Sequence, residues 1–223
     1  MEIKVLKNVL IKNNAIGNDN RLLFYKHNIF TLNIMSSPGA GKTTLLENSL
    51  EYLNNKYKTA VIEGDLYTSR DAERLAPYNI PIVQINTDGG CHLDARMIHG
   101  ALQSLDLNKI NLLVIENVGN LVCPASFDLG EHIKVLVYSI TEGADKPKKY
   151  ASMFSNVDAV LVNKIDLASI CNIDLEQVCN EIREINPKGE LFKIAANNRN
   201  TLHEWLSWLD KKAEEIITQG NKK

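Results

Sequence analysis

The stretch "SSPGAGKTT", Ser36 to Thr44, lies between a strand-like run, "IFTLNIM", and a segment of helical period, "TTLLENSLEYL". Glycines in such a loop let backbone N–H groups curve around phosphate oxygens, and the helix that follows adds the positive end of its dipole. The lysine reaches the β- and γ-phosphates, and the hydroxyl beside it holds Mg2+. Strand, loop and helix occur in the order that a P-loop requires, although Ser36 replaces the first glycine of the usual pattern. The residues predicted to bind a nucleotide here are Gly39, Ala40, Gly41, Lys42, Thr43 and Thr44.

Short runs rich in Val and Ile alternate with segments of helical period along the rest of the chain, which is typical of a parallel sheet covered by helices. The predicted strands are 30–35, 59–64, 80–85, 111–116, 133–140, 157–163 and 191–195. The predicted helices are 42–55, 69–76, 92–105, 147–154, 174–186 and 201–217. The sequence therefore predicts an α/β fold of the three-layer P-loop NTPase type, with a mostly parallel seven-stranded sheet and helices on both faces.

A chain of 223 residues can bury one sizeable core, so one domain is expected to contain nearly all of these elements. Residues 29–218 are predicted to form the nucleotide-binding domain, and residues 219–223 a C-terminal tail. Residues 1–28 are expected to be an N-terminal helical arm, whose amphipathic pattern is broken by "NNAIGNDN" at 13–20.

Composition limits the partners that the chain can have. The 25 Lys and Arg residues against 27 Asp and Glu residues give a formal charge of -2, which argues against a nucleic-acid or membrane partner. No run approaches the roughly 18 apolar residues of a membrane span, and the N-terminus is not built as a signal peptide. We therefore expect a cytoplasmic protein, whose four cysteines are free thiols for metal binding, catalysis or packing.

The base is expected to be guanine. "NKID", Asn163 to Asp166, follows a Val-rich run, at the edge where open α/β sheets bind ligands. The Asp166 carboxylate can accept two hydrogen bonds from guanine, whereas adenine lacks that pair of donors, and an unpaired buried acid discriminates strongly. Asn163 and Lys164 belong to the same motif. Ala196 and Asn197 are expected to offer backbone N–H groups to the guanine oxygen, without the Ser-Ala-Lys usual in GTPases.

Two acidic motifs, "EGD" at 63–65 and "ENVG" at 116–119, each end a predicted strand beside the phosphate site. Glu116 is expected to hold Mg2+ through water, and the Gly119 N–H to contact the γ-phosphate. Asp65 is a second candidate acid, either arranging Mg2+ or orienting the attacking water. Lys42, Thr43, Asp65 and Glu116 are therefore the predicted catalytic residues.

Cys91 and His92 are adjacent in "DGGCHLDA", where a helix is expected to begin. A thiol at a helix N-terminus has its thiolate favoured, and with a neutral imidazole it makes a ligand pair for a borderline or soft metal ion. Cys123 would be a third ligand if the fold brings the loops together, and a second copy of the chain could add more. A packed free thiol is the competing interpretation. Cys171 and Cys179 are expected to be ordinary thiols.

Taken in order over residues 30–200, the motifs resemble those of the HypB family, the nickel-insertion GTPases of [NiFe]-hydrogenase maturation. They are "SSPGAGKTT", "EGD", "CHLDA", "ENVGNLVCP", "TEGADK" and "NKIDL". "CHLDA" with "ENVGNLVCP" is the specific part. The resemblance implies a Mg2+-dependent GTPase of the signal-recognition and MinD-like class that forms a homodimer when GTP binds. It also implies nickel transfer to the hydrogenase large subunit, with a small zinc-containing nickel chaperone as partner.

By the same resemblance, Cys91, His92 and Cys123 are metal ligands at the dimer interface, and Lys149 reaches the other protomer's nucleotide. Ni2+ is the implied ion, although Zn2+ can bind the same atoms. Because only "NLV" separates Gly119 from Cys123, a shift of Gly119 on γ-phosphate binding is expected to move Cys123. GTP would then control when the metal is held.

Other functions are weighed against this one. A urease-type nickel GTPase chaperone would place a proline between the cysteine and the histidine, which are contiguous here. A GTPase chaperone for a cobalamin-dependent enzyme would not need Cys91 and Cys123. A metal-binding module without turnover would bind Ni2+ equally well with Lys42 replaced by Ala.

Overall fold

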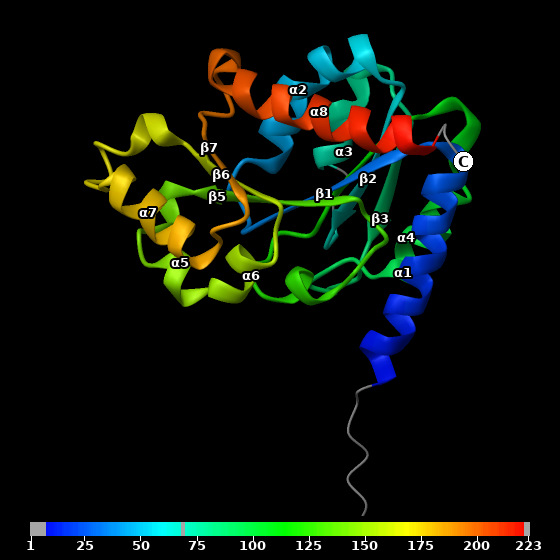
Figure 1. The fold of residues 1–223 in the computed structure, drawn as a ribbon, viewed down its shortest axis with the longest axis horizontal. Coiled ribbons are helices and arrows are strands. Elements are labelled where there is room, and N and C mark those ends of the chain that lie inside the picture. The colour runs from blue at the N-terminus through cyan, green and yellow to red at the C-terminus, as the bar shows by residue number, and fades with distance from the viewer. Residues whose placement is uncertain (1–7, 68–69, 221–223) are drawn as a thin grey trace, which may run out of the picture.

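A parallel seven-stranded sheet runs through the middle of the molecule, in the order β3-β2-β4-β1-β5-β6-β7 (Figure 1). The computed structural model describes residues 8–67 and 70–220, and within them every strand pair is parallel. The strands are β1 (Phe30–Ser36), β2 (Thr59–Asp65), β3 (Ile82–Asn86), β4 (Leu112–Glu116), β5 (Ile133–Ser139), β6 (Ala159–Asn163) and β7 (Glu190–Lys193). The predicted α/β class is confirmed, and the sheet is entirely rather than mostly parallel.

Helices cover both faces of this sheet (Figure 1). They are α1 (Asn8–His27), α2 (Lys42–Lys56), α3 (Arg70–Leu75), α4 (Ala95–Leu102), α5 (Lys146–Lys149), α6 (Ala151–Ser155), α7 (Leu175–Ile185) and α8 (His203–Gly220). Side chains from α2, α3 and α8 pack on one face of the sheet, and those from α1, α4, α6 and α7 pack on the other. Successive strand residues such as Val114 and Ile115 enter opposite cores, as the period of two requires.

The break expected at 13–20 in the N-terminal segment is wrong, because α1 continues through it. Its polar side chains bind neighbouring backbone instead: Asn13 Nδ2 donates to Asp128 O at 2.8 Å, and Asn20 Nδ2 donates to Ala95 O at 2.9 Å. Gly17 lies so close to the loop that contains Asp128 that an added Cβ would be 2.8 Å from Asp128 O. The segment thus docks α1 on the domain. Residues 1–7 of the expected arm lie outside the described residues.

The helix expected from residue 92 begins only at Ala95, where Asp94 caps α4 by accepting a hydrogen bond from Met97 N at 2.8 Å. Cys91 and His92 therefore lie in a loop, and the expectation that a helix N-terminus favours the Cys91 thiolate is wrong.

Two further segments differ in detail from their predictions. The helix expected at 147–154 divides into α5 and α6 at Tyr150. α8 follows a short 3-10 turn, Arg199–Leu202, and extends through residue 220, whereas residues 221–223 of the expected tail lie outside the described part. None of the described helices combines the length and the apolar character needed to cross a membrane.

Candidate functional site

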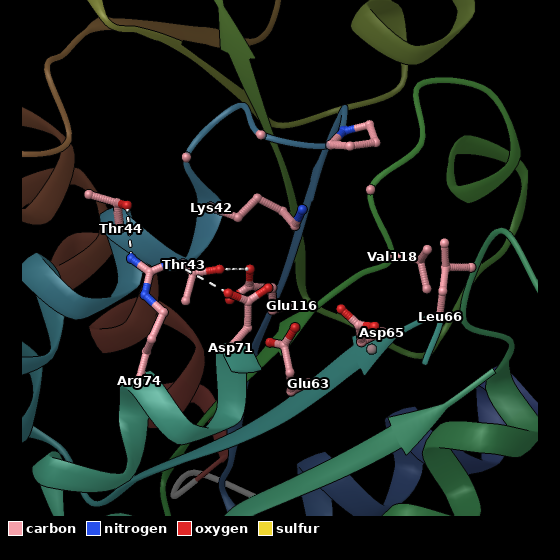
Figure 2. A pocket seen from close by; sticks show the side chains of 15 residues that line it. Lys42, Thr43, Thr44, Glu63, Asp65, Leu66, Asp71, Arg74, Glu116 and Val118 are labelled. Atoms are coloured by element: carbon pink, nitrogen blue, oxygen red, sulfur yellow. Dashed lines mark hydrogen bonds and ion pairs between the residues drawn. The ribbon is translucent and has the colours of Figure 1, made fainter. Parts of the chain in front are cut away.

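The loop between β1 and α2 has the shape of a phosphate cradle. Gly39 and Gly41 have φ angles of 73° and 101°, which residues with a Cβ rarely adopt, and Gly41 is the N-cap of α2. Lys42 Nζ donates to Ser36 Oγ at 3.0 Å from within a cavity of about 410 Å³ (Figure 2). The backbone N–H groups at the start of α2 and the Lys42 ammonium together suit the phosphates of a nucleotide.

Three carboxylates gather at the wall of this cavity: Glu63 at the end of β2, Glu116 at the end of β4, and Asp71 in α3 (Figure 2). Their ligand oxygens lie within 4.8 Å of one another. Thr43 Oγ1 donates to Glu116 Oε1 at 2.7 Å. The Oε2 atoms of Glu63 and Glu116 are buried and have no hydrogen-bond partner in the described part of the chain.

The electrostatics of the pair call for a cation or a proton. Burial raises the pKa of both Glu63 and Glu116, and the charge of Glu116 raises that of Glu63 further. The Lys42 ammonium opposes the shift at both groups. Carboxylate and hydroxyl oxygens are the ligands that Mg2+ prefers, so the orphaned oxygens fit this ion.

Of the predicted acids, Glu116 lies in this cluster with Thr43, while Asp65 lines the same cavity and accepts from Tyr67 N at 2.8 Å. Sequence reasoning missed Glu63 and Asp71. A signal for Glu63 was present, because "VIE" occurs in both β2 and β4, at 61–63 and 114–116, and the two strands pair with Glu63 opposite Glu116.

The "NKID" residues brace the P-loop from the end of β6. Asn163 Nδ2 donates to Ala40 O at 2.7 Å, and Lys164, at φ 61°, donates through Nζ to Gly39 O at 2.8 Å. Ala196 N donates to Asn163 Oδ1 at 2.9 Å, so this N–H is already bonded to protein. The Asp166 side chain is exposed beside them, where a base can reach it. Asn197 is also exposed.

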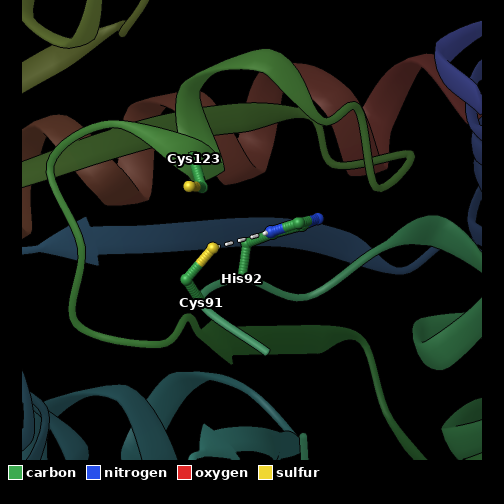
Figure 3. A group of neighbouring side chains, drawn as sticks. All are labelled: Cys91, His92 and Cys123. Carbon is green, nitrogen blue, oxygen red and sulfur yellow. Dashed lines mark hydrogen bonds between the residues drawn. The ribbon is translucent and has the colours of Figure 1, made fainter. Parts of the chain in front are cut away.

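Cys91, His92 and Cys123 meet although they come from two separate loops (Figure 3). Their ligand atoms lie within 4.8 Å of one another, all three residues are half-buried, and Cys91 Sγ is 3.5 Å from His92 Nδ1. The His92 ring stacks on Phe127 with 3.8 Å between centroids. Burial lowers the pKa of His92, which keeps the imidazole in the neutral form that binds metals. The predicted trio therefore forms one cluster with the donor set of a thiolate–imidazole metal site.

A short turn that packs on the phosphate loop also carries Cys123. Asn120 N donates to Ser36 O at 2.7 Å, and a Cβ added to Gly119 would lie 2.9 Å from Pro38 Cα. Asn120 Oδ1 in turn accepts from Cys123 N at 3.2 Å. Proximity to Cys91 and burial raise the pKa of the Cys123 thiol. A single turn thus touches the P-loop and carries a sulfur ligand.

The family model described as "CobW/HypB/UreG, nucleotide-binding domain" matches residues 30–193. The hydrogenase maturation factor HypB of Escherichia coli K12 is 47% identical over 210 residues, which cover 94% of this chain and 72% of that protein. The chain belongs to the HypB family. A probable hydrogenase maturation factor HypB of Methanocaldococcus jannaschii is 37% identical over 214 residues and is covered to 97% of its length, with 96% of this chain.

A solved HypB structure has the same fold. HypB from Helicobacter pylori in complex with nickel superposes with a TM-score of 0.87 at 38% identity, covering 92% of this chain and 97% of that one. The resemblance to HypB drawn from the motifs is confirmed, and so is the P-loop fold.

Lys146 is a basic residue near the nucleotide site that was not predicted. The predicted Lys149 is exposed, with Nζ 5.8 Å from the centroid of the Tyr150 ring. Lys146, three positions earlier, lines a groove of about 460 Å³ together with Gly119 and Asn120. Lys146 is therefore a second candidate for the role that the resemblance implies for Lys149.

Proposed function

We propose that this chain is a Mg2+-dependent GTPase that holds nickel between Cys91, His92 and Cys123 and transfers it toward a [NiFe]-hydrogenase under the control of GTP. The observation that carries the proposal is the turn from Gly119 to Cys123, which packs on the P-loop at one end and carries a thiol ligand at the other. Membership of the HypB family supports it.

GTP would lie along the P-loop, with its base over the end of β6. Lys42 exchanges its bond to Ser36 for the β- and γ-phosphate oxygens, and the backbone N–H groups at the start of α2 hold the phosphates. The exposed Asp166 carboxylate accepts from the guanine edge. The exposed Asn197 offers its backbone N–H to the guanine oxygen, since that of Ala196 is already bonded to Asn163. Residues from three strand ends thereby position one nucleotide.

Mg2+ would be held by Thr43 and Glu116, with Glu63 and Asp71 beside them, and when bound it neutralises charge that develops on the phosphates. Asp65, at the cavity wall, is the residue that we assign to orienting the attacking water. Lys42 stabilises the transferred phosphoryl group electrostatically. The acids of β2 and β4 thus divide between cation binding and water positioning.

Nickel is the cargo of this GTPase. Two thiolates and a neutral imidazole suit Ni2+, and Zn2+ can occupy the same atoms. Because the three ligands are only half-buried, a second copy of the chain can add its own ligands, which supports a GTP-dependent homodimer. Lys149 or Lys146 would then reach the other protomer's nucleotide. A small zinc-containing nickel chaperone and the hydrogenase large subunit are the proposed partners, in the cytoplasm.

The test is a titration of Ni2+ and Zn2+ into the nucleotide-free, GDP-bound and GTP-analogue-bound protein, with molecular mass followed in parallel. We expect metal affinity and dimer formation to depend on the nucleotide. Cys123→Ala should lower Ni2+ affinity at least about tenfold, equivalent to about 1.4 kcal/mol. Cys171→Ala, a half-buried thiol outside the cluster, is the matched control.

Full Ni2+ affinity in the Cys123→Ala variant would remove that residue from the site. Equal metal uptake and equal mass in all three nucleotide states would refute control by GTP, even if GTP hydrolysis remained. A Lys42→Ala variant that still loads and releases nickel normally would favour a metal-binding module without turnover.

A further inference from the structure

We propose that Asn117 is a positioning residue that joins the Cys91–His92 loop to the nucleotide site, so that nickel affinity depends on GTP through a buried contact as well as through the exposed turn to Cys123. This inference rests on the proposed function and adds a second route of control to it. Its basis is a hydrogen bond between Asn117 and Leu93, the residue that follows His92.

Asn117 stands where the two sites meet. It directly follows Glu116 at the end of β4 and is 1% exposed. Its Oδ1 accepts from Leu93 N at 3.1 Å and from Val118 N at 2.9 Å. One side-chain oxygen therefore holds both the loop that carries Cys91 and His92 and the turn that leads to Gly119.

The Asn117 amide is fixed in this orientation by its other end. Nδ2 donates to Asn33 Oδ1 at 3.3 Å, and Asn33 Nδ2 donates to Glu131 Oε1 at 3.1 Å. Glu131 Oε2 accepts from Leu129 N at 2.7 Å. A flip of the amide would set donors against donors, at a substantial energetic cost in a buried site. The Asn117 backbone is held as well, since its N–H donates to Ile34 O at 2.9 Å.

A residue of β2 contacts Leu93 from a second side. The Leu93 side chain is fully buried and lies against Gly64, where an added Cβ would be 2.7 Å from Leu93 Cδ1. Gly64 separates Glu63 from Asp65, the two acids at the end of β2. A displacement of either acidic strand end is consequently transmitted to Leu93, by hydrogen bond from β4 and by contact from β2.

Each half of the metal cluster therefore has its own attachment to the nucleotide site. Cys123 is attached through the turn that packs on the P-loop, and Cys91 and His92 are attached through Leu93. Closely packed interiors shift between discrete arrangements rather than deforming continuously. A change of contacts at Glu116 can therefore increase or decrease the distance between Cys123 and the Cys91–His92 pair.

The experiment measures coupling rather than activity. Ni2+ affinity is determined by chelator competition for full-length protein bound to GDP and to a non-hydrolysable GTP analogue, and the ratio of the two dissociation constants is the readout. For the wild type we expect a ratio of about 5 to 150, the usual range of allosteric coupling. Asn117→Ala should lower the ratio at least about threefold, while the turn to Cys123 retains part of the coupling and both ligands still bind.

Asn186→Ala is the matched control, because it removes another buried amide, which bonds Phe154 O, Val157 O and Gly189 N and lies outside the Asn117 network. It should lower the melting temperature and keep the wild-type ratio. Asn117→Leu has a similar volume but offers no oxygen to Leu93 N, so it should reduce the ratio also, and it tests the inference if Asn117→Ala does not fold.

A wild-type ratio retained in Asn117→Ala overturns the inference, as does one retained in Asn117→Leu when that is the variant that folds. An equal fall in Asn186→Ala also overturns it, since that points to general loosening. A wild type that binds nickel and GTP with a ratio of one overturns this inference and the proposed control by GTP, but leaves both binding sites standing. Failure of the wild type to bind nickel or GTP at all would refute the proposed function itself.

Discussion

At the residue scale, the most consequential arrangement is the pair of buried carboxyl groups at the ends of β2 and β4. Burial raises the pKa of Glu63 and Glu116, so above the ordinary carboxyl pKa the folded state holds a proton that the unfolded state has released. The Mg2+-free protein should therefore lose stability as the pH rises from about 4.5 toward neutrality. Mg2+ would replace that proton.

Glu63→Gln should consequently stabilise the metal-free protein. Removing one of two facing acids relieves their repulsion, and we expect a rise in melting temperature in EDTA at pH 7.5 of about 2 to 4 °C, or about 1 kcal/mol. The same variant should lose the extra stabilisation that Mg2+ gives to the GDP-bound wild type. Thermal scans with EDTA and with Mg2+ measure both effects; a lower melting temperature in EDTA would contradict the explanation.

His132 gives the fold a second dependence on pH. Its ring lies edge-on to Tyr25 at 5.1 Å between centroids, and its Nδ1 accepts from Thr31 N at 3.0 Å. Burial, together with the positive charge of Arg21, lowers its pKa to about 4. Below the ordinary histidine pKa of about 6.5, the unfolded chain binds a proton that the folded chain does not bind. The free energy of unfolding therefore falls as the pH drops toward 4.

Replacing His132 should remove this dependence. In urea unfolding, we expect His132→Gln to reduce by about 2 kcal/mol the loss of stability between pH 7.5 and pH 5, because glutamine can still accept from Thr31 N but does not titrate in this range. His203→Gln, at an exposed histidine, is the control. The explanation fails if the two variants show the same pH profile.

Single residues were predictable where a motif fixes both type and spacing. Lys42, Thr43 and Glu116 were predicted in this way, and the structure places all three at one cavity. Asp71 could not be found, because its approach to the cavity depends on the path of the chain between β2 and α3, for which the sequence holds no spacing rule. Glu63 had a partial signal in the "VIE" that it shares with the strand ending in Glu116, but the pairing of the two strands was not predictable.

At the scale of elements, tertiary contacts decide where α1 and α4 depart from their predictions. Asparagine and glycine weaken an isolated helix, yet in α1 they bond or touch the 128–129 loop. The start of α4 was a missed cap, because "CHLDA" already contains an aspartate, a favoured N-cap residue, three positions before Met97. Element types were therefore more predictable than element boundaries.

Two helical glycines should respond oppositely to the same substitution. Gly17→Ala should destabilise the protein by about 1 to 3 kcal/mol, because the new Cβ would lie 2.8 Å from Asp128 O. Gly100→Ala, in α4, should stabilise it by up to about 1 kcal/mol, because an added Cβ there meets nothing within 4 Å. Urea unfolding of both variants measures the difference. Stabilisation by Gly17→Ala would show that α1 is not tightly docked.

At the scale of the whole molecule, the two proposed sites should influence each other equally. Binding free energies are linked, so the factor by which a GTP analogue changes Ni2+ affinity must equal the factor by which Ni2+ changes affinity for the analogue. We expect the second factor to match the first in calorimetry at one protein concentration. Cys91→Ala should abolish the effect of Ni2+ while preserving nucleotide binding; unequal factors would mean that the metal also binds elsewhere.

The class of the sheet was predictable, but its strand order was not. Alternation of apolar runs with helical segments is enough to indicate a parallel sheet. It does not reveal that β4 inserts between β2 and β1, which is what brings Glu116 beside both Glu63 and Thr43. The meeting of Cys91 with Cys123 follows from the same insertion, since their loops extend from neighbouring parts of one sheet edge.

The strand order also governs how the protein is made. β1 is flanked by β4 and β5, so both of its neighbours are synthesised long after it. Pairing over such separations is slow, because the closure of a long loop precedes any gain in contacts. On the ribosome, the phosphate loop therefore stays without its flanking strands until residue 139 has emerged, and a nascent chain shorter than this has no finished pocket for nucleotide to stabilise.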